Sequence, residues 1–115
     1  MVHDRPSGRE LVQAVREFLE GDVLAAAEGR VRFHTRVAIN ALAIVEREME
    51  LGAAHETAHR ARLAGLGFAD DAALAAAIRA GRLDDRHHEV KAALVAAVRA
   101  KLDVANPRYL TPPPA

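Results

Sequence analysis

The sequence predicts an all-α protein: a single-domain bundle of about five helices around a long central helix, followed by an extended, proline-rich C-terminal tail. Apolar residues recur at helical spacing through most of the 115 residues, and no segment shows the alternation of a half-buried strand. Half of the residues are apolar but only 3% are aromatic, so the core must consist mainly of Ala, Val and Leu, which suits closely packed helices. All prolines except Pro6 lie beyond residue 106.

A capping box predicts the start of the first helix, because Ser7 is followed three residues later by Glu10. The apolar stripe behind it is formed by Leu11, Val12, Val15, Phe18 and Leu19. Gly21 is expected to end this helix, and Asp22 can cap a shorter one that ends at Gly29. One bent helix is the alternative, since a glycine weakens a helix without forbidding it. The sequence favours a break.

The longest helical pattern runs from about residue 30 to residue 51 and contains neither Gly nor Pro, with Gly52 expected just after its end. At about 100° per residue, one face of this helix is apolar and is predicted to belong to the core. Its members are Val31, His34, Ala38, Ala41, Leu42, Val45 and Met49. His34 is therefore expected to be a buried, hydrogen-bonded imidazole.

The opposite face of the same helix mixes basic, amide and apolar side chains. We call it the outer stripe, formed by Phe33, Arg36, Asn40, Ile44 and Arg47, with Arg32 and Ala43 on the same face. Glutamates, including Glu46, follow near its end. Asn40 is a poor helix former in the middle of a helix, a position that a specific hydrogen bond would justify. A solvated face and a partner- or ligand-binding face explain the stripe equally well.

Three further helices are predicted in the second half of the chain. The first is an alanine-rich helix over 54–66 that is closed by Gly65 and Gly67, and the second runs from its cap Asp70 to Gly81. The last helix is capped by Asp84 or Asp85 and ends near Ala105. The residues along one side of it are Val90, Leu94, Ala97, Val98, Lys101 and Leu102.

The predicted domain boundary separates a helical bundle, residues 1–105, from a tail, residues 106–115. Pro107 and the three prolines that come after Thr111 cannot continue a helix, so an extended, polyproline-like tail is expected. Tyr109 and Leu110 are its apolar residues and are expected to hold it against the bundle.

Charge and composition argue against several classes of protein. Sixteen basic and sixteen acidic residues cancel without a long run of one sign, so neither nucleic acid nor a membrane surface is an expected partner. The longest apolar run, Ala72–Ile78, is far shorter than the roughly 20 residues that span a bilayer, and the N-terminus lacks the apolar core of a signal peptide. A cytoplasmic location is expected. The absence of cysteine excludes disulfides and thiolate chemistry.

His55, Glu56 and His59 match the H-E-x-x-H pattern of zinc hydrolases, in which two imidazoles bind the metal and Glu acts as general base. The third ligand is missing, because Arg62 and Gly65 stand where the extended pattern requires Gly and His. The surrounding residues are charged and typical of an exposed helix. We therefore predict no enzyme activity, no cofactor and no resident metal, and keep a small zinc hydrolase as an alternative.

Three segments together resemble a family of small bacterial proteins of unknown function. They are Phe33–Glu48, the opening Asp4-Arg5-Pro6 with the apolar stripe behind it, and Lys101–Tyr109. Members of this family are typically encoded beside aminoglycoside-phosphotransferase-like kinases and acyl-CoA dehydrogenases. The resemblance covers nearly the whole chain.

The resemblance implies a non-catalytic accessory or activating subunit of such a kinase, similar to the small companion subunit of 4-hydroxyacyl-CoA kinase. The positions that match the family are Phe33, His34, Arg36, Asn40, Glu46, Arg47, Asn106, Pro107 and Tyr109. The kinase is expected to bind the outer stripe and the segment with Asn106 and Tyr109, and the arginines of the stripe could instead reach the phosphates of coenzyme A. A homodimer that buries the same stripe is the alternative.

Overall fold

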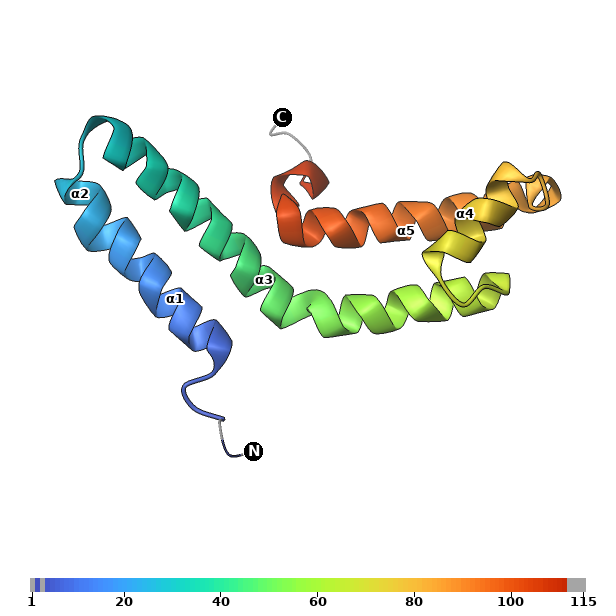
Figure 1. Cartoon of the computed structure of the whole chain (residues 1–115), viewed down its shortest axis with the longest axis horizontal. Coiled ribbons are helices and arrows are strands. Elements are labelled where there is room, and N and C mark those ends of the chain that lie inside the picture. Colours follow the sequence, from blue (N-terminus) through green and yellow to red (C-terminus); the bar gives the residue numbers. More distant parts are fainter. Residues whose placement is uncertain (1, 3, 112–115) are drawn as a thin grey trace. The chain divides into compact units, whose positions relative to one another are not determined.

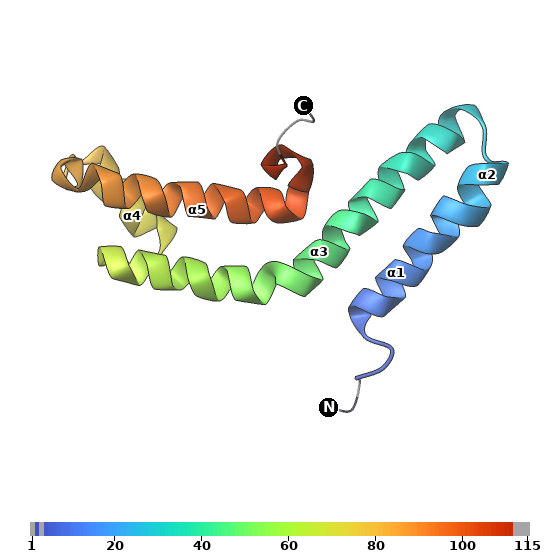
Figure 2. The ribbon, with the colours of Figure 1, turned by 180° about the vertical axis from the view of Figure 1, so that it is seen from behind.

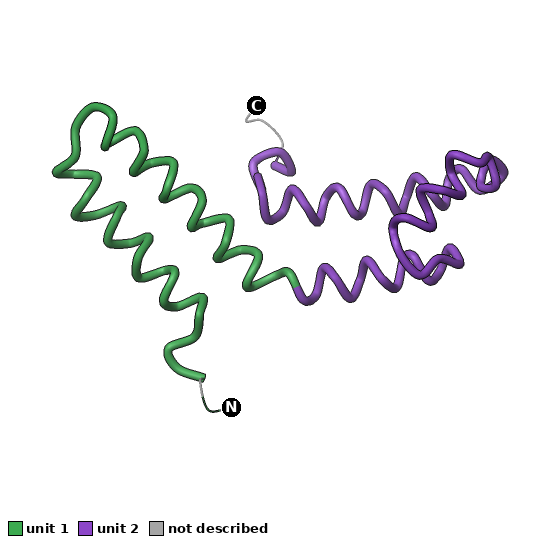
Figure 3. Tube along the Cα trace, viewed as in Figure 1, with its two compact units in different colours: residues 1–52 green, residues 53–115 purple. Residues whose placement is uncertain are grey.

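The computed structural model of the chain describes residue 2 and residues 4–111, and all secondary structure in this part of the chain is helical (Figure 1). The all-α prediction is confirmed. Contacts divide the chain into two compact units, an N-terminal unit (residues 1–52) and a C-terminal unit (residues 53–115), shown in Figure 3. That residues 1–105 form one domain stays a prediction. No helix among the described residues is long and apolar enough to cross a membrane.

Helix α1 (Gly8–Phe18) begins at the predicted capping box. The Ser7 hydroxyl accepts a hydrogen bond from the backbone N–H of Glu10 at 3.1 Å, and the Glu10 carboxylate accepts one from the backbone N–H of Ser7 at 3.4 Å. Both bonds satisfy backbone donors that the first turn of a helix leaves without an intrahelical partner.

The predicted break at Gly21 is wrong. The chain continues through a π-helical segment, Leu19–Val23, into the short helix α2 (Leu24–Ala26). The wider π-turn carries Gly21 without ending the helix, since one glycine costs only about 1 kcal/mol in a helix. The chain reverses later, where Ala27 is extended and Gly29 has a φ of 55°.

Helix α3 (Gly29–Leu66) is much longer than predicted and appears as one continuous helix in both views (Figures 1 and 2). The expected end at Gly52 is wrong, and the helix predicted over 54–66 is the second half of α3. The cause is local: two alanines follow Gly52, and no proline is present to remove a backbone donor.

The end of α3 is set by Gly67, as the sequence predicts. Gly67 has a φ of 95°, its N–H bonds the carbonyl of Ala64 at 3.0 Å, and the N–H of Phe68 bonds the carbonyl of Leu63 at 2.9 Å. This is a Schellman motif, and it folds Phe68 back onto the core next to Leu63.

The C-terminal unit is completed by α4 (Asp71–Arg79) and α5 (His87–Ala105). The predicted cap of α4 is confirmed, because Asp70 accepts a hydrogen bond from the N–H of Ala73 at 2.8 Å. Gly81, with a φ of 75°, follows its end as predicted. The core of the unit is formed by Leu63, Leu66, Leu74, Ala77, Leu83 and Val90.

The predicted aspartate cap of α5 is wrong. Asp84–Arg86 form a 3₁₀ turn, and no side chain caps the helix. Arg86 instead donates to the carbonyl of Leu66 at 3.2 Å and to the Glu89 carboxylate at 2.8 Å, which ties the end of α3 to the start of α5. The hydrogen bond with the Glu89 carboxylate raises the pKa of Arg86 above its ordinary value.

In the N-terminal unit, α1 and the first half of α3 lie side by side and run in opposite directions (Figures 1 and 2). The predicted core face of α3 is not the face that packs on α1. Val31 is 61% exposed and Met49 51% exposed, whereas Thr35 and Glu46 retain only 7% and 9% exposure. The helix is turned from the predicted orientation, because Glu46 points toward α1.

A short helix stands directly after α5, where the sequence predicts an extended tail. Pro107–Leu110 form a 3₁₀-helix that the N–H of Tyr109 closes on the carbonyl of Asn106 at 3.1 Å. Pro107 fits at the first position of this turn, where its missing N–H has no intrahelical role. Tyr109 is 75% exposed, so the expectation that it holds the tail is wrong, while Leu110 is half-buried. The prolines at 112–114 lie outside the described residues.

The capping box of α1 yields a stability prediction. Ser7→Ala removes the acceptor for the N–H of Glu10 and should lower the free energy of unfolding by about 1 kcal/mol. Ser7→Asp keeps an acceptor at the cap and should stay within about 0.3 kcal/mol of the natural chain. Urea titration followed by circular dichroism measures both, and equal losses in the two variants would contradict the capping role.

Candidate partner-binding surfaces

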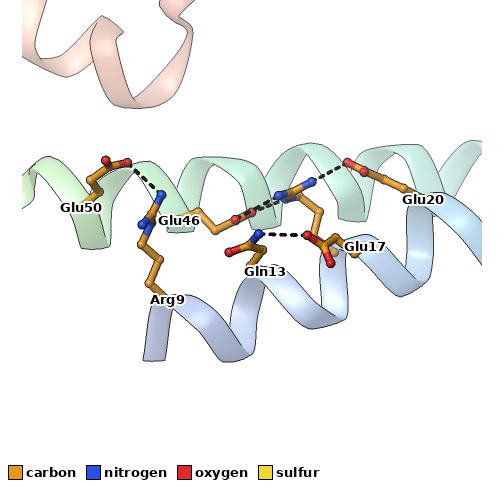
Figure 4. Close-up of polar contacts among 7 residues, drawn as sticks. Arg9, Gln13, Glu17, Glu20, Glu46 and Glu50 are labelled. Carbon is orange, nitrogen blue, oxygen red and sulfur yellow. Dashed lines mark hydrogen bonds and ion pairs between the residues drawn. The ribbon is translucent and has the colours of Figure 1, made fainter. Parts of the chain in front are cut away.

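A nearly buried ion pair joins the two helices of the N-terminal unit (Figure 4). Arg16 of α1 donates through Nε and Nη2 to the two carboxylate oxygens of Glu46 on α3, the Nη2–Oε1 distance being 3.1 Å. Its Nη1 donates to Glu20 at 2.9 Å. The side chains of Arg16 and Glu46 are only 22% and 11% exposed. Hydrogen bonds to Glu46, and then to Glu20, raise the pKa of Arg16 above its ordinary value, so the guanidinium keeps its charge.

The pair determines how α1 lies on α3. A two-pronged guanidinium–carboxylate contact is directional, and a charge removed from water without its partner is costly. Arg9 and Glu50, one to two turns away, add an ion pair of 3.3 Å that is about half exposed and contributes little (Figure 4). Arg16 and Glu46 therefore fix the rotation of α3 about its axis. Helical periodicity did not predict this rotation.

This rotation leaves one side of the α1/α3 pair uncovered. We call it the open side, formed by Leu11, Val15 and Phe18 of α1 with Val31, Val45 and Met49 of α3, all of which are exposed. A groove of about 460 Å³ lies between the helices there, with Leu19 on one wall and Val31 and Ala38 on the other. Apolar side chains gathered in this way mark a surface for contact with another molecule.

The outer stripe lies on the part of α3 that does not pack on α1. Phe33 is 62% exposed, and Arg36 and Asn40 are exposed, whereas Ile44 and Arg47 are half-buried. Arg47 has an interaction within the chain. Among the described residues, neither the guanidinium of Arg36 nor the amide of Asn40 has a hydrogen-bond partner. The hydrogen bond that would justify Asn40 in mid-helix is thus not made inside the described chain.

His34 is exposed rather than buried, so that prediction is wrong. It accepts a hydrogen bond from Arg30 at 3.4 Å and meets the ring of Phe33 edge to face at 5.3 Å between centroids. The cause is the rotation of α3 that brings Glu46 to face α1, because this rotation places His34 outside the contact with α1. Asn106 and Tyr109, the remaining candidate residues, belong to the C-terminal unit, where Asn106 is half-buried.

The H-E-x-x-H residues pair with other groups of the C-terminal unit. His59 Nε2 lies 2.7 Å from Asp71 Oδ1 of α4, and His55 Nε2 lies 3.5 Å from Asp103 Oδ2 of α5. Glu56 accepts from Arg60 Nε at 2.9 Å. Within the described part of the chain, no three His, Asp or Glu side chains are placed to hold a metal ion. In this arrangement the two histidines connect α3 to α4 and α5.

The fold and these surfaces define a small all-α protein built on one long helix. The chain belongs to the family described as Domain of unknown function (DUF6285), whose profile matches residues 25–109. The match contains all of α3, α4 and α5 and begins after α1. Neither the curated proteins nor the solved structures contain a match to the chain.

The ion pair predicts a difference between two neighbouring glutamates. Glu46→Ala leaves the guanidinium of Arg16 without its main partner at a nearly buried position and should lower the free energy of unfolding by about 2 kcal/mol. Glu50→Ala breaks the exposed pair with Arg9 and should cost no more than about 0.5 kcal/mol. Urea unfolding followed by circular dichroism compares them, and equal costs would show that the Arg16–Glu46 pair does not hold α1 on α3.

Proposed function

We propose that this chain is a non-catalytic accessory or activating subunit of an aminoglycoside-phosphotransferase-like kinase that acts on hydroxyacyl-CoA substrates in the cytoplasm. The observation that carries the proposal is the outer stripe, where the exposed ring of Phe33 is followed along α3 by the Arg36 guanidinium and the Asn40 amide, neither of which has a hydrogen-bond partner among the described residues. The choice of a kinase as partner comes from the family resemblance of the Phe33–Glu48 segment. The phosphotransfer chemistry would belong to the kinase.

The chemistry of the stripe suits a protein partner. Phe33, Arg36 and Asn40 follow at intervals of three and four residues, so they form one row about 10 Å long. Aromatic residues and Arg supply most of the binding free energy at protein interfaces. Phe33 would enter a pocket of the kinase, and Arg36 and Asn40 would donate to its carboxylates or carbonyls. Arg36 and Arg47 could alternatively bind the phosphates of coenzyme A held by the kinase.

Changes in the outer stripe test the proposal. The double variant Phe33→Ala, Arg36→Glu should bind the co-expressed neighbouring kinase at least about 30-fold more weakly, because two interface residues that cost about 1–2 kcal/mol each are lost. Both side chains are exposed, so helicity and melting temperature should stay unchanged. Co-purification followed by calorimetric titration measures the effect.

Arg82→Glu is the matched control, since Arg82 is an exposed arginine of the C-terminal unit. It should bind the kinase like the natural chain. Binding that survives in the Phe33→Ala, Arg36→Glu variant would exclude the outer stripe as the docking site, and the absence of any complex with the natural chain would refute the accessory role itself.

A homodimer is the second candidate, and the open side suits its interface better than the outer stripe does. Val31, Ala38 and Val45 recur every seven residues on α3, and Leu11, Val15 and Phe18 lie at helical spacing on α1. Two antiparallel helix pairs that bury such faces against each other form a four-helix bundle. This dimer would leave the outer stripe available for the kinase.

The dimer has its own test. Val15→Glu with Val31→Glu places two charges on the open side and should convert a dimer into a monomer in sedimentation equilibrium, because apolar contacts are replaced by carboxylates that lose water. Phe33→Ala, Arg36→Glu should leave the dimer intact. A natural chain that sediments as a monomer at about 100 μM would exclude the dimer as a stable state.

A further inference from the structure

The C-terminal unit carries an apolar groove that the proposed kinase contact does not use. Its volume is about 450 Å³, and its walls come from Ile78 of α4 and from Val90, Leu94, Val95 and Val98 of α5. Val98 is 57% exposed, and Leu94 and Val95 are nearly as open. The sequence places Val90, Leu94 and Val98 along one side of this helix, but of these three only Val90 belongs to the core, against which Ala93 packs. Leu94, Val95 and Val98 therefore stay exposed and lie outside the core that the described residues form.

The charged residues that line this groove are basic. His87, Lys91 and Arg99 contribute to its walls, and no carboxylate is among the described lining residues. Neither Lys91 nor Arg99 has an ion pair within residues 4–111. The acidic residues of α5 are engaged elsewhere, Glu89 with Arg86 at 2.8 Å and Asp103 with His55 at 3.5 Å.

One carboxylate lies close by. Asp84 lines an adjoining hollow of about 220 Å³ that shares Ile78, His87 and Val90 with the groove. It stands at the His87 end of α5, about 10 Å or more along the helix axis from the level of Lys91, and farther still from that of Arg99. The groove thus offers apolar contacts together with two cations, Lys91 and Arg99, that have no ion pair among the described residues and attract negative charge.

We propose that this groove binds an acidic amphipathic helix of a partner protein. A helix laid into an apolar groove is recognised by apolar residues at i, i+3 or i+4 and i+7, and charges at the rim select its flanking residues. Lys91 and Arg99 are eight residues apart, which corresponds to about 12 Å along α5. The partner helix therefore carries two carboxylates about two turns apart, with apolar residues between them that contact Leu94, Val98 and Ile78.

Charge argues against a second copy of this chain in the groove. Antiparallel pairing of two α5 helices about Val95 would place Lys91 of one copy opposite Arg99 of the other, and parallel pairing would place each cation opposite itself. Like charges meet in both arrangements, which is unfavourable. The openness of the groove argues against a small ligand, because sites for small molecules enclose most of the ligand surface.

The proposal concerns residues 78–99 and does not depend on the kinase contact through the outer stripe. A fluorescent helical peptide with three leucines at i, i+4 and i+7 and two flanking glutamates eight positions apart is the probe. Full-length protein should bind it in fluorescence anisotropy, and a peptide with lysines in place of the glutamates should bind at least about 10-fold more weakly.

Charge reversal in the protein provides the decisive comparison. Lys91→Glu with Arg99→Glu should weaken the acidic peptide about 10-fold and strengthen the basic peptide by a similar factor. Both residues are exposed, so the fold should be retained in circular dichroism. Arg108→Glu, an exposed cation outside the groove, is the matched control and should change neither affinity. Val98→Asp should abolish binding of both peptides.

Four results would overturn the proposal. They are no binding of the acidic peptide up to about 1 mM, equal affinity for acidic and basic peptides, a medium-chain fatty acid that binds while the peptide does not, and self-association of the natural chain that Val98→Asp abolishes. If Val98→Asp does not fold, the exchange of charges between protein and peptide still decides between the outcomes. Loss of kinase binding in outer-stripe variants has no bearing on it.

Discussion

The contact between Arg16 and Glu46 is the constraint on which the N-terminal unit depends. Arg16 lies in the stripe of α1 that faces α3, and its charge can be placed there only opposite a carboxylate. Glu46 supplies that carboxylate, and α3 is turned to bring it inward. As a consequence, apolar side chains such as Val31 and Met49 become exposed. One polar contact therefore determines which surface of α3 is available to other molecules.

The C-terminal unit shows the same separation between a small core and exposed apolar residues. Leu63 and Leu66 of α3 pack with Leu74 and Ala77 of α4, and the Gly67 turn and Arg86 hold the chain around them. The opposite side of α5 stays outside this core. Exposed apolar surface is unfavourable for an isolated chain, so its presence in both units supports the interpretation of a protein that works in contact with partners.

Sequence reasoning predicted features that depend on neighbouring residues and missed those that depend on distant ones. The caps at Ser7 and Asp70 and the turns at Gly67 and Gly81 are local, and each was found. Gly52 was misjudged because a glycine ends a helix only when the next residues also disfavour it. The face of α3 depends on Arg16, thirty residues earlier. The sequence does contain an indication of this contact, because the charged residue Arg16 lies between Val12 and Leu19 in an otherwise apolar stripe.

Phe33, Arg36, Asn40, Ile44 and Arg47 form a pattern on one helix, so the outer stripe can be described from the sequence alone, while its role in binding a partner stays a prediction. The partner of these residues cannot be predicted in this way. The side chains on a helix surface determine which kinds of contact it can make, but they do not identify the protein that makes them. The direct measurement is the phosphotransfer rate of the proposed partner, an aminoglycoside-phosphotransferase-like kinase acting on a hydroxyacyl-CoA, titrated with this chain. For an activating subunit, the rate should rise and saturate as the complex forms. A rate that is unchanged by the chain at every concentration would contradict that role.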